Sequence, residues 1–233
     1  EKDLVRGLLF SESIYRDLDT HPKLEATGIN EDGYITAINL QIPEHLILKD
    51  FAGTRNVMSA SSCGLCGKTA FDDKTQVKII NTKILDPALV GHMFDQVSEQ
   101  QSSFQQSGGT HAAGAFTMDG TMLSMREDIG RHNAVDKVIG DLIYNNLLSQ
   151  AKCLTVSGRI SFEIVSKAIS AGIPYLASVS APSSLAVDVA EESGLTLMAF
   201  CRNHKLTVYS NTGRVQTDDL VEAMAPVNRK ENV

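Results

Sequence analysis

Two cysteines in a short polar segment are the residues of this chain best suited to chemistry. Cys63 and Cys66 lie three positions apart within residues 61–68, which read SSCGLCGK. At this spacing one thiol can attack an S–S or S–SH bond while the other resolves the product. Lys68 and nearby backbone N–H groups favour the thiolate, which is the reactive form. The segment therefore predicts thiols that handle sulfur.

Three other interpretations of the cysteine pair remain open. A structural zinc site needs four ligands, but there is no second C-x-x-C, and Cys153 and Cys201 stand alone in apolar, strand-like runs typical of core thiols. A thioredoxin-type motif normally lies at a strand-to-helix junction, whereas this segment is a loop rich in Ser and Gly. Cysteines without a role would be an oxidation liability there. Reactive thiols are favoured, and no metal ligands are expected.

His111 follows two glycines in residues 108–115, GGTHAAGA. Zinc nucleobase deaminases carry His-x-Glu with a downstream Pro-Cys-x-x-Cys. Here two alanines follow the histidine, and the C-x-x-C lies upstream without the proline, so deamination is excluded although the fold can still be related. A lone histidine is more often structural. The glycines let a ligand approach closely, which makes His111 a candidate binding residue.

Residues 126–137, REDIGRHNAVDK, gather charge around a strand-to-helix junction. Asp128 is suited to cap the helix, and His132 and Asp136 share one helical face at i, i+4. A solvated helix start would explain this pattern without any function. However, the strand before and the helix after are apolar, and α/β sheets place their sites at such ends. Arg131 and His132 are therefore candidate binding residues.

Two further turns and a strand end carry groups that suit an anion. Small and hydroxyl residues lie at two expected helix N-termini, in residues 156–161 (VSGRIS) and 178–184 (SVSAPSS). Free N–H groups at a helix N-terminus bind anions. Serine is also common at this position for helix stability alone. Arg159 adds a forked donor that matches phosphate. We expect these groups to form a phosphate-binding rim with the end of the last apolar strand. The candidates are Arg159, Ser180, Ser183, Phe200, Cys201, Arg202, Asn203, His204 and Lys205.

Patterns of apolar residues and turn signals predict the elements that position these groups. An Asp-Gly pair at 119–120 between two apolar runs predicts a hairpin. Short apolar strands then alternate with helices, which indicates a layered α/β sheet. We expect a smaller N-terminal α+β region at 1–80 and the α/β domain at 81–233. Helices are expected at 3–15, 86–102, 132–148, 161–171 and 183–193, and strands at 34–40, 114–118, 122–125, 152–157, 174–179 and 195–200.

Composition narrows the classes of function. Hydrophobic residues make up 42% and charged residues 21% of the 233 residues, as in ordinary globular proteins. A net charge of -7 and the absence of Trp argue against nucleic-acid binding. No apolar run reaches the length of about eighteen residues that a membrane span needs. Without a signal peptide and with only four cysteines, the chain is expected in the cytoplasm.

These motifs, in this order, resemble the FdhD family of formate dehydrogenase accessory sulfurtransferases over nearly the whole chain. The resemblance implies a cytidine-deaminase-like α/β domain without zinc. It further implies that the protein passes sulfur from a cysteine desulfurase to the molybdenum (or tungsten) bis-guanine-dinucleotide cofactor of formate dehydrogenase. By position, Cys63 matches the persulfide-bearing residue, Cys66 its partner, and residues 200–205 the cofactor-binding segment.

The resemblance also sets expectations about partners and about the chain itself. The molybdenum cofactor is expected as a bound substrate, with no permanently bound cofactor, and the desulfurase and the catalytic subunit of formate dehydrogenase as partners. A homodimer is compatible with it. The family's N-terminal strands are largely missing, so we expect a truncated or disordered start. The alternative function is a non-catalytic chaperone that binds and delivers the cofactor, with the thiols as transient ligands.

Overall fold

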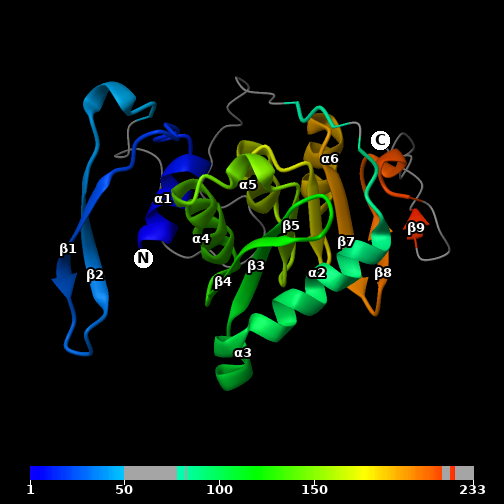
Figure 1. The fold of residues 1–233 in the computed structure, drawn as a ribbon, viewed down its shortest axis with the longest axis horizontal. Coiled ribbons are helices and arrows are strands. Elements are labelled where there is room, and N and C mark those ends of the chain that lie inside the picture. The colour runs from blue at the N-terminus through cyan, green and yellow to red at the C-terminus, as the bar shows by residue number, and fades with distance from the viewer. Residues whose placement is uncertain (50–77, 82, 217–220, 224–233) are drawn as a thin grey trace, which may run out of the picture.

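A seven-stranded mixed sheet forms the centre of the computed structural model (Figure 1), which describes residues 1–49, 78–81, 83–216 and 221–223. In spatial order, the strands of this sheet are β4 (Met122–Asp128), β3 (His111–Phe116), β5 (Cys153–Val156), β6 (Tyr175–Ser178), β7 (Thr196–Arg202), β8 (Lys205–Val208) and β9 (Val221–Ala223).

Strand direction decides where the site can form. β3 and β4 make the predicted hairpin, whose turn contains Gly120 at φ 84°. β3 also runs antiparallel to β5, whereas β5, β6 and β7 are mutually parallel. The carboxyl ends of these three strands therefore meet at one edge of the sheet, where open α/β sheets bind ligands.

Helices cover both faces of the sheet. On one face α4 (Arg131–Tyr144), α5 (Phe162–Ser170) and α6 (Ser184–Ser193) pack against residues such as Leu154 and Val156, and on the other α2 (Pro87–Gln100) packs near Cys153. Successive residues of a strand point to opposite faces of the sheet. The apolar side chains of β5 therefore contribute to two hydrophobic cores, one on each face. The three layers confirm the predicted α/β class. No helix in the described ranges has the length and apolar character that crossing a bilayer requires.

The N-terminal helix α1 (Lys2–Ser11) packs directly on α4, so part of the region predicted as 1–80 joins the helical layer of the α/β domain. Beside it, β1 (Lys23–Ile29) and β2 (Ile35–Gln41) form a separate two-stranded hairpin, of which β1 was not predicted (Figure 1). The short helices among the described residues are α3 (Ser102–Ser107), η1 (Glu44–Leu46), η2 (Leu148–Gln150) and η3 (Thr212–Arg214).

Two glycines allow α1 and α4 to cross at very short distance. A Cβ atom at Gly140 would overlap the carbonyl oxygen of Asp3, and one at Gly7 would overlap the carbonyl oxygen of Asp136. Both obstacles are backbone atoms, which cannot rotate away. The helix crossing therefore requires glycine on both helices.

We predict that Gly140→Ala lowers the free energy of unfolding by about 1–3 kcal/mol, because the added methyl group pushes the two helices apart. Gly213→Ala is the matched control, since nothing lies within 4 Å of a Cβ there. Urea unfolding followed by circular dichroism measures both variants. Equal midpoints for Gly140→Ala and the wild type would contradict the close crossing.

Candidate functional site

The loops that follow the three parallel strands are joined by backbone hydrogen bonds. Ile160 after β5 donates to the carbonyl of Ala181 (3.1 Å) and accepts from the N–H of Ser183 (2.9 Å). Phe200 in β7 donates to the carbonyl of Ser180 (3.3 Å). The turns that the sequence singled out separately therefore form one continuous edge, as predicted.

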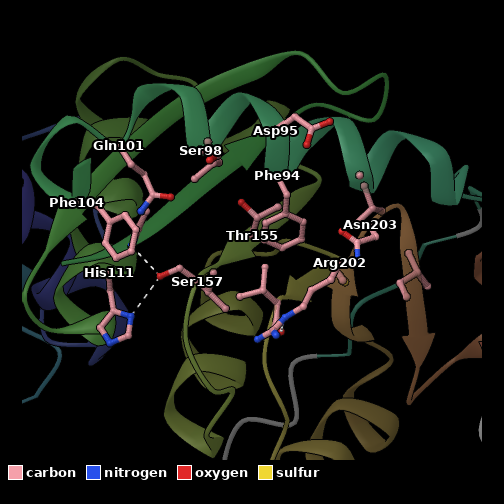
Figure 2. A pocket seen from close by; sticks show the side chains of 18 of the residues that line it. Phe94, Asp95, Ser98, Gln101, Phe104, His111, Thr155, Ser157, Arg202 and Asn203 are labelled. Atoms are coloured by element: carbon pink, nitrogen blue, oxygen red, sulfur yellow. Dashed lines mark hydrogen bonds between the residues drawn. The ribbon is translucent and has the colours of Figure 1, made fainter. Parts of the chain in front are cut away.

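A cavity of about 870 Å³ lies between this edge and the helices α2 and α3. Figure 2 shows side chains of α2 projecting toward Thr155, Ser157 and Arg202 across the cavity. Its volume falls within the range typical of small-molecule sites, about 300–1,000 Å³. Among the predicted binding residues, those lining it are His111, Cys201, Arg202, Asn203, His204 and Lys205.

The turn between β7 and β8 brings the basic residues of this list to one end of the cavity. Asn203 and His204 both have positive φ, 51° and 57°, as a two-residue hairpin of type I′ requires. The ring of His204 packs over Gly91 of α2, where a Cβ would overlap it. Arg202 donates from Nε to the carbonyl of Val179 (2.9 Å), which holds its guanidinium group at this end.

Phe200 lies just before this turn, at an irregularity in the pairing of β7 with β8. Its φ of 54° is rare for a bulky residue and marks a locally strained backbone. The ring is exposed and does not line the cavity; it lies 6.3 Å from that of Tyr209. This bulge shifts the register of β7 just before Arg202.

His111 marks the other end of the cavity. Its Nδ1 lies 3.2 Å from the hydroxyl oxygen of Ser157, which also accepts the N–H of Ala112 at 2.9 Å (Figure 2). Burial, together with the positive charges of Arg131 and His132, lowers the pKa of His111 below 6.5. The imidazole is therefore neutral at pH 7, and its contact with Ser157 fixes the orientation of the ring.

Arg131 stands beside His111, and the charge of Arg159 acts in turn on Arg131. A Cβ at Gly158 would lie 3.1 Å from both Arg131 Cδ and His111 Cε1, so the absence of a side chain there permits this packing. Burial, followed by the positive charge of Arg159, lowers the pKa of Arg131, and Glu163 opposes this shift. Neither arginine lines the cavity, but two guanidinium groups close enough to repel each other favour the binding of an anion between them.

His132 is held by the N-terminus of α5. Its Nε2 lies 3.1 Å from Ser161 Oγ and 3.2 Å from a carboxylate oxygen of Glu163, and Ser161 donates to the same oxygen at 3.1 Å. These contacts place His132 next to the His111 cluster and fix its ring. His132 does not line the cavity.

Much of the charge in residues 126–137 serves the fold. Asp128 accepts from the N–H of Gly130 (2.8 Å) and pairs with Lys137 (2.6 Å). Although burial raises the pKa of Asp128, the hydrogen bond from Lys137 and then that from Gly130 lower it more, and the net pKa is below 3.8. The prediction that Asp128 caps α4 is wrong, because the N-cap residue is Gly130 and no side chain caps the helix. Asp128 instead holds the turn before α4 through Gly130 and Lys137.

The two predicted serines lie outside the cavity lining. Ser180 contributes its carbonyl to the loop network, and Ser183 caps α6 by accepting the N–H of Ala186 (3.2 Å); neither lines the cavity. Cys63 and Cys66 lie outside the described residues. The expectation that Cys153 and Cys201 are buried thiols is confirmed. Burial raises the pKa of both thiols, that of Cys201 to about 12.

The helix at 86–102 was predicted, but neither α3 nor the cavity wall that α2 and α3 form was predicted. This wall contributes Phe94, Ser98, Gln101 and Phe104 to the cavity (Figure 2). Their spacing is that of an ordinary amphipathic helix and its continuation. Among the described residues, no group of three or more His, Cys, Asp or Glu side chains is placed to hold a metal ion.

The fold and site define a layered α/β protein with a basic cavity at the carboxyl ends of parallel strands. A model described as the FdhD/NarQ family matches residues 1–216, and the chain belongs to this family. The sulfur carrier protein FdhD of Nocardia farcinica is 44% identical over 223 residues, covering 92% of this chain and 78% of that protein. The sulfur carrier protein FdhD of Sulfurisphaera tokodaii is 38% identical over 216 residues, covering 92% of this chain and 80% of that protein.

A crystal structure of a candidate formate dehydrogenase accessory protein from Desulfotalea psychrophila has the same fold. It superposes with a TM-score of 0.66 at 21% identity, covering 92% of this chain and 79% of that chain. At this level of identity the likeness concerns the fold.

We predict that Arg131→Gln raises the pKa of His111, because the substitution removes a positive charge that disfavours the imidazolium form. The chemical shift of the His111 ring, followed by NMR from pH 4 to 8, measures the pKa. Lys23→Gln removes a positive charge on β1 and serves as the control. An unchanged His111 titration in Arg131→Gln would mean that the two side chains do not interact.

Proposed function

We propose that this chain is a sulfur carrier that delivers sulfur to a nucleotide-bearing metal cofactor. Cys63 takes sulfane sulfur from a cysteine desulfurase as a persulfide, a reversible modification of a reactive thiol. The recipient is the molybdenum (or tungsten) bis-guanine-dinucleotide cofactor of formate dehydrogenase. The names of the relatives, sulfur carrier protein FdhD, support the sulfur-carrying part of this proposal.

The observation that carries the proposal is the cavity with cationic groups at both ends. Arg202 and Lys205 line one end, and the cation at the other end is Arg131, which packs beside the neutral imidazole of His111. These cations stand out against a chain of net charge -7. Arginine forks match phosphate oxygens, so the cavity suits a phosphorylated ligand.

The sulfur step breaks one S–S bond. Transfer moves the outer sulfur of the Cys63 persulfide to the recipient, and Cys63 leaves as a thiolate. Cys66 can also attack the persulfide, which forms a Cys63–Cys66 disulfide and releases the sulfur as hydrosulfide. The fast exchange of such thiols depends on their thiolate form, which Lys68 favours.

We predict that incubation with a cysteine desulfurase and L-cysteine adds one sulfur atom to the peptide that contains Cys63 and Cys66. Cys153 and Cys201 serve as internal controls, because burial raises their pKa values and keeps both thiols protonated. Mass spectrometry of peptides prepared without reductant measures the modification. Unmodified Cys63 and Cys66 would exclude the carrier function.

The chaperone alternative is tested by activity. A Cys63→Ala variant that still activates formate dehydrogenase in cells lacking the native carrier would favour cofactor delivery without sulfur transfer. We expect the variant to lose activation.

We predict that Arg202→Gln weakens the binding of guanosine diphosphate about 10- to 100-fold. A hydrogen bond to a charged group contributes about 1.5–3 kcal/mol, and each 1.4 kcal/mol is a tenfold change in Kd. Isothermal titration calorimetry measures the affinity, with Lys23→Gln as the charge-matched control. Equal affinity in Arg202→Gln and the wild type would remove Arg202 from the site.

A further inference from the structure

The helix α3 has few attachments to the rest of the described structure. It contains no buried residue, although it forms part of the cavity wall. A break at Gln101, with ψ 67°, separates it from α2. After its last residue the chain turns at Gly108, which has a φ of 66°. Figure 1 shows α3 at the far end of α2 from β8.

One carboxylate fastens both ends of this segment. Glu127 in β4 accepts the N–H groups of Ser103 (2.9 Å) and Phe104 (2.8 Å), and it also accepts the hydroxyl of Thr110 (2.8 Å). Although burial raises the pKa of Glu127, these hydrogen bonds lower it more, so the group is ionised at neutral pH. Hydrogen bonds to an ionised carboxylate are stronger than those between neutral groups.

The glycines after α3 have room to move. No atom lies within 4 Å of a Cβ built at Gly108, and Gly109 meets only atoms of Ser107, at 3.8 Å or more. The non-helical residue Gln101 and this pair of glycines bracket α3. Hinges are commonly a few residues at element ends that absorb changes in φ and ψ.

Phe104 is the apolar side chain that α3 presents to the cavity. It is 45% exposed and lies in the cavity wall with Phe94 of α2 (Figure 2). Because the ring of Phe104 is partly exposed, its contacts within the protein bury only part of its apolar surface. A planar ligand ring that stacks on it would bury both surfaces.

We propose that α3 is a lid that closes on the heteroaromatic ring of a bound nucleotide, with Phe104 as the stacking residue and Glu127 as the positioning residue. The proposal rests on the proposed function, because that function places a guanine nucleotide in this cavity. Phosphate is held by the basic groups at the strand ends, and the base is held by the lid. Ligand affinity therefore divides into two parts that respond to different residues.

Comparison of two probes separates these parts. Guanosine diphosphate carries phosphates and a base, whereas inorganic pyrophosphate carries phosphates alone. We predict that Phe104→Leu weakens the binding of guanosine diphosphate about tenfold or more, since base stacking on an aromatic side chain contributes on this scale, and leaves pyrophosphate binding unchanged. Tyr34→Leu, which removes an exposed aromatic side chain next to β2, is the control.

The outcomes distinguish the lid from the proposed function. If the wild type binds neither probe in isothermal titration calorimetry, the nucleotide site and the lid both fail. If the wild type binds guanosine diphosphate and Phe104→Leu binds it equally well, the lid alone is overturned. Equal weakening of both probes by Phe104→Leu would also overturn it, because a lid that contacts the base does not act on pyrophosphate.

Glu127→Gln tests the positioning role. The amide of Gln has one carbonyl oxygen in place of two carboxylate oxygens, so it cannot accept all three bonds with the same strength. We expect faster hydrogen exchange at the amides of 102–110, slower exchange when guanosine diphosphate is added, and weaker binding of this probe with pyrophosphate affinity retained. Glu99→Gln on the exposed side of α2 is the control. Unchanged exchange at 102–110 would overturn the role of Glu127.

Discussion

The buried ion pair between Asp136 of α4 and Lys167 of α5 fixes the frame on which the site is built. Both side chains are no more than 3% exposed, and Lys167 donates to the two carboxylate oxygens at 2.7 and 2.8 Å. Breaking a buried pair costs about 3–5 kcal/mol, because the remaining charge is uncompensated. One helical turn earlier on each helix, His132 contacts Glu163. The two pairs together hold α4 and α5 in register.

This register has consequences for charge at the edge of the sheet. The start of α4 carries Arg131, and the loop before α5 carries Arg159, so fixing the helices also holds two guanidinium groups near each other. Their repulsion is an unfavourable contribution that the helix packing offsets. An anion that binds between them removes part of it. In the proposed function this arrangement prepares the site for a negative ligand, and such preorganisation lowers the cost of binding.

The sequence contained enough information to predict strands β3 to β7 of the sheet, but β8, β9 and the cavity were not predicted. The apolar run 152–157 predicted β5 because both faces of that strand are buried. Runs of this kind also ended where the loops that follow the parallel strands begin. In contrast, α3 has no buried residue and no apolar period, and it is fastened by Glu127, which lies about twenty positions away in sequence. The strand β1 was missed for a related reason, because most of its residues are exposed and Gly28 interrupts its register.

The thiols of the described residues are unsuited to the sulfur step, which limits where sulfur can come from. Cys201 is the one cysteine in the described lining of the cavity, and burial raises its pKa to about 12, so its thiol stays protonated. A protonated thiol is a poor nucleophile. In the proposed function sulfur is therefore carried to the ligand by Cys63. In this proposal the cavity supplies charge and orientation, and the sulfur chemistry belongs to Cys63 and Cys66.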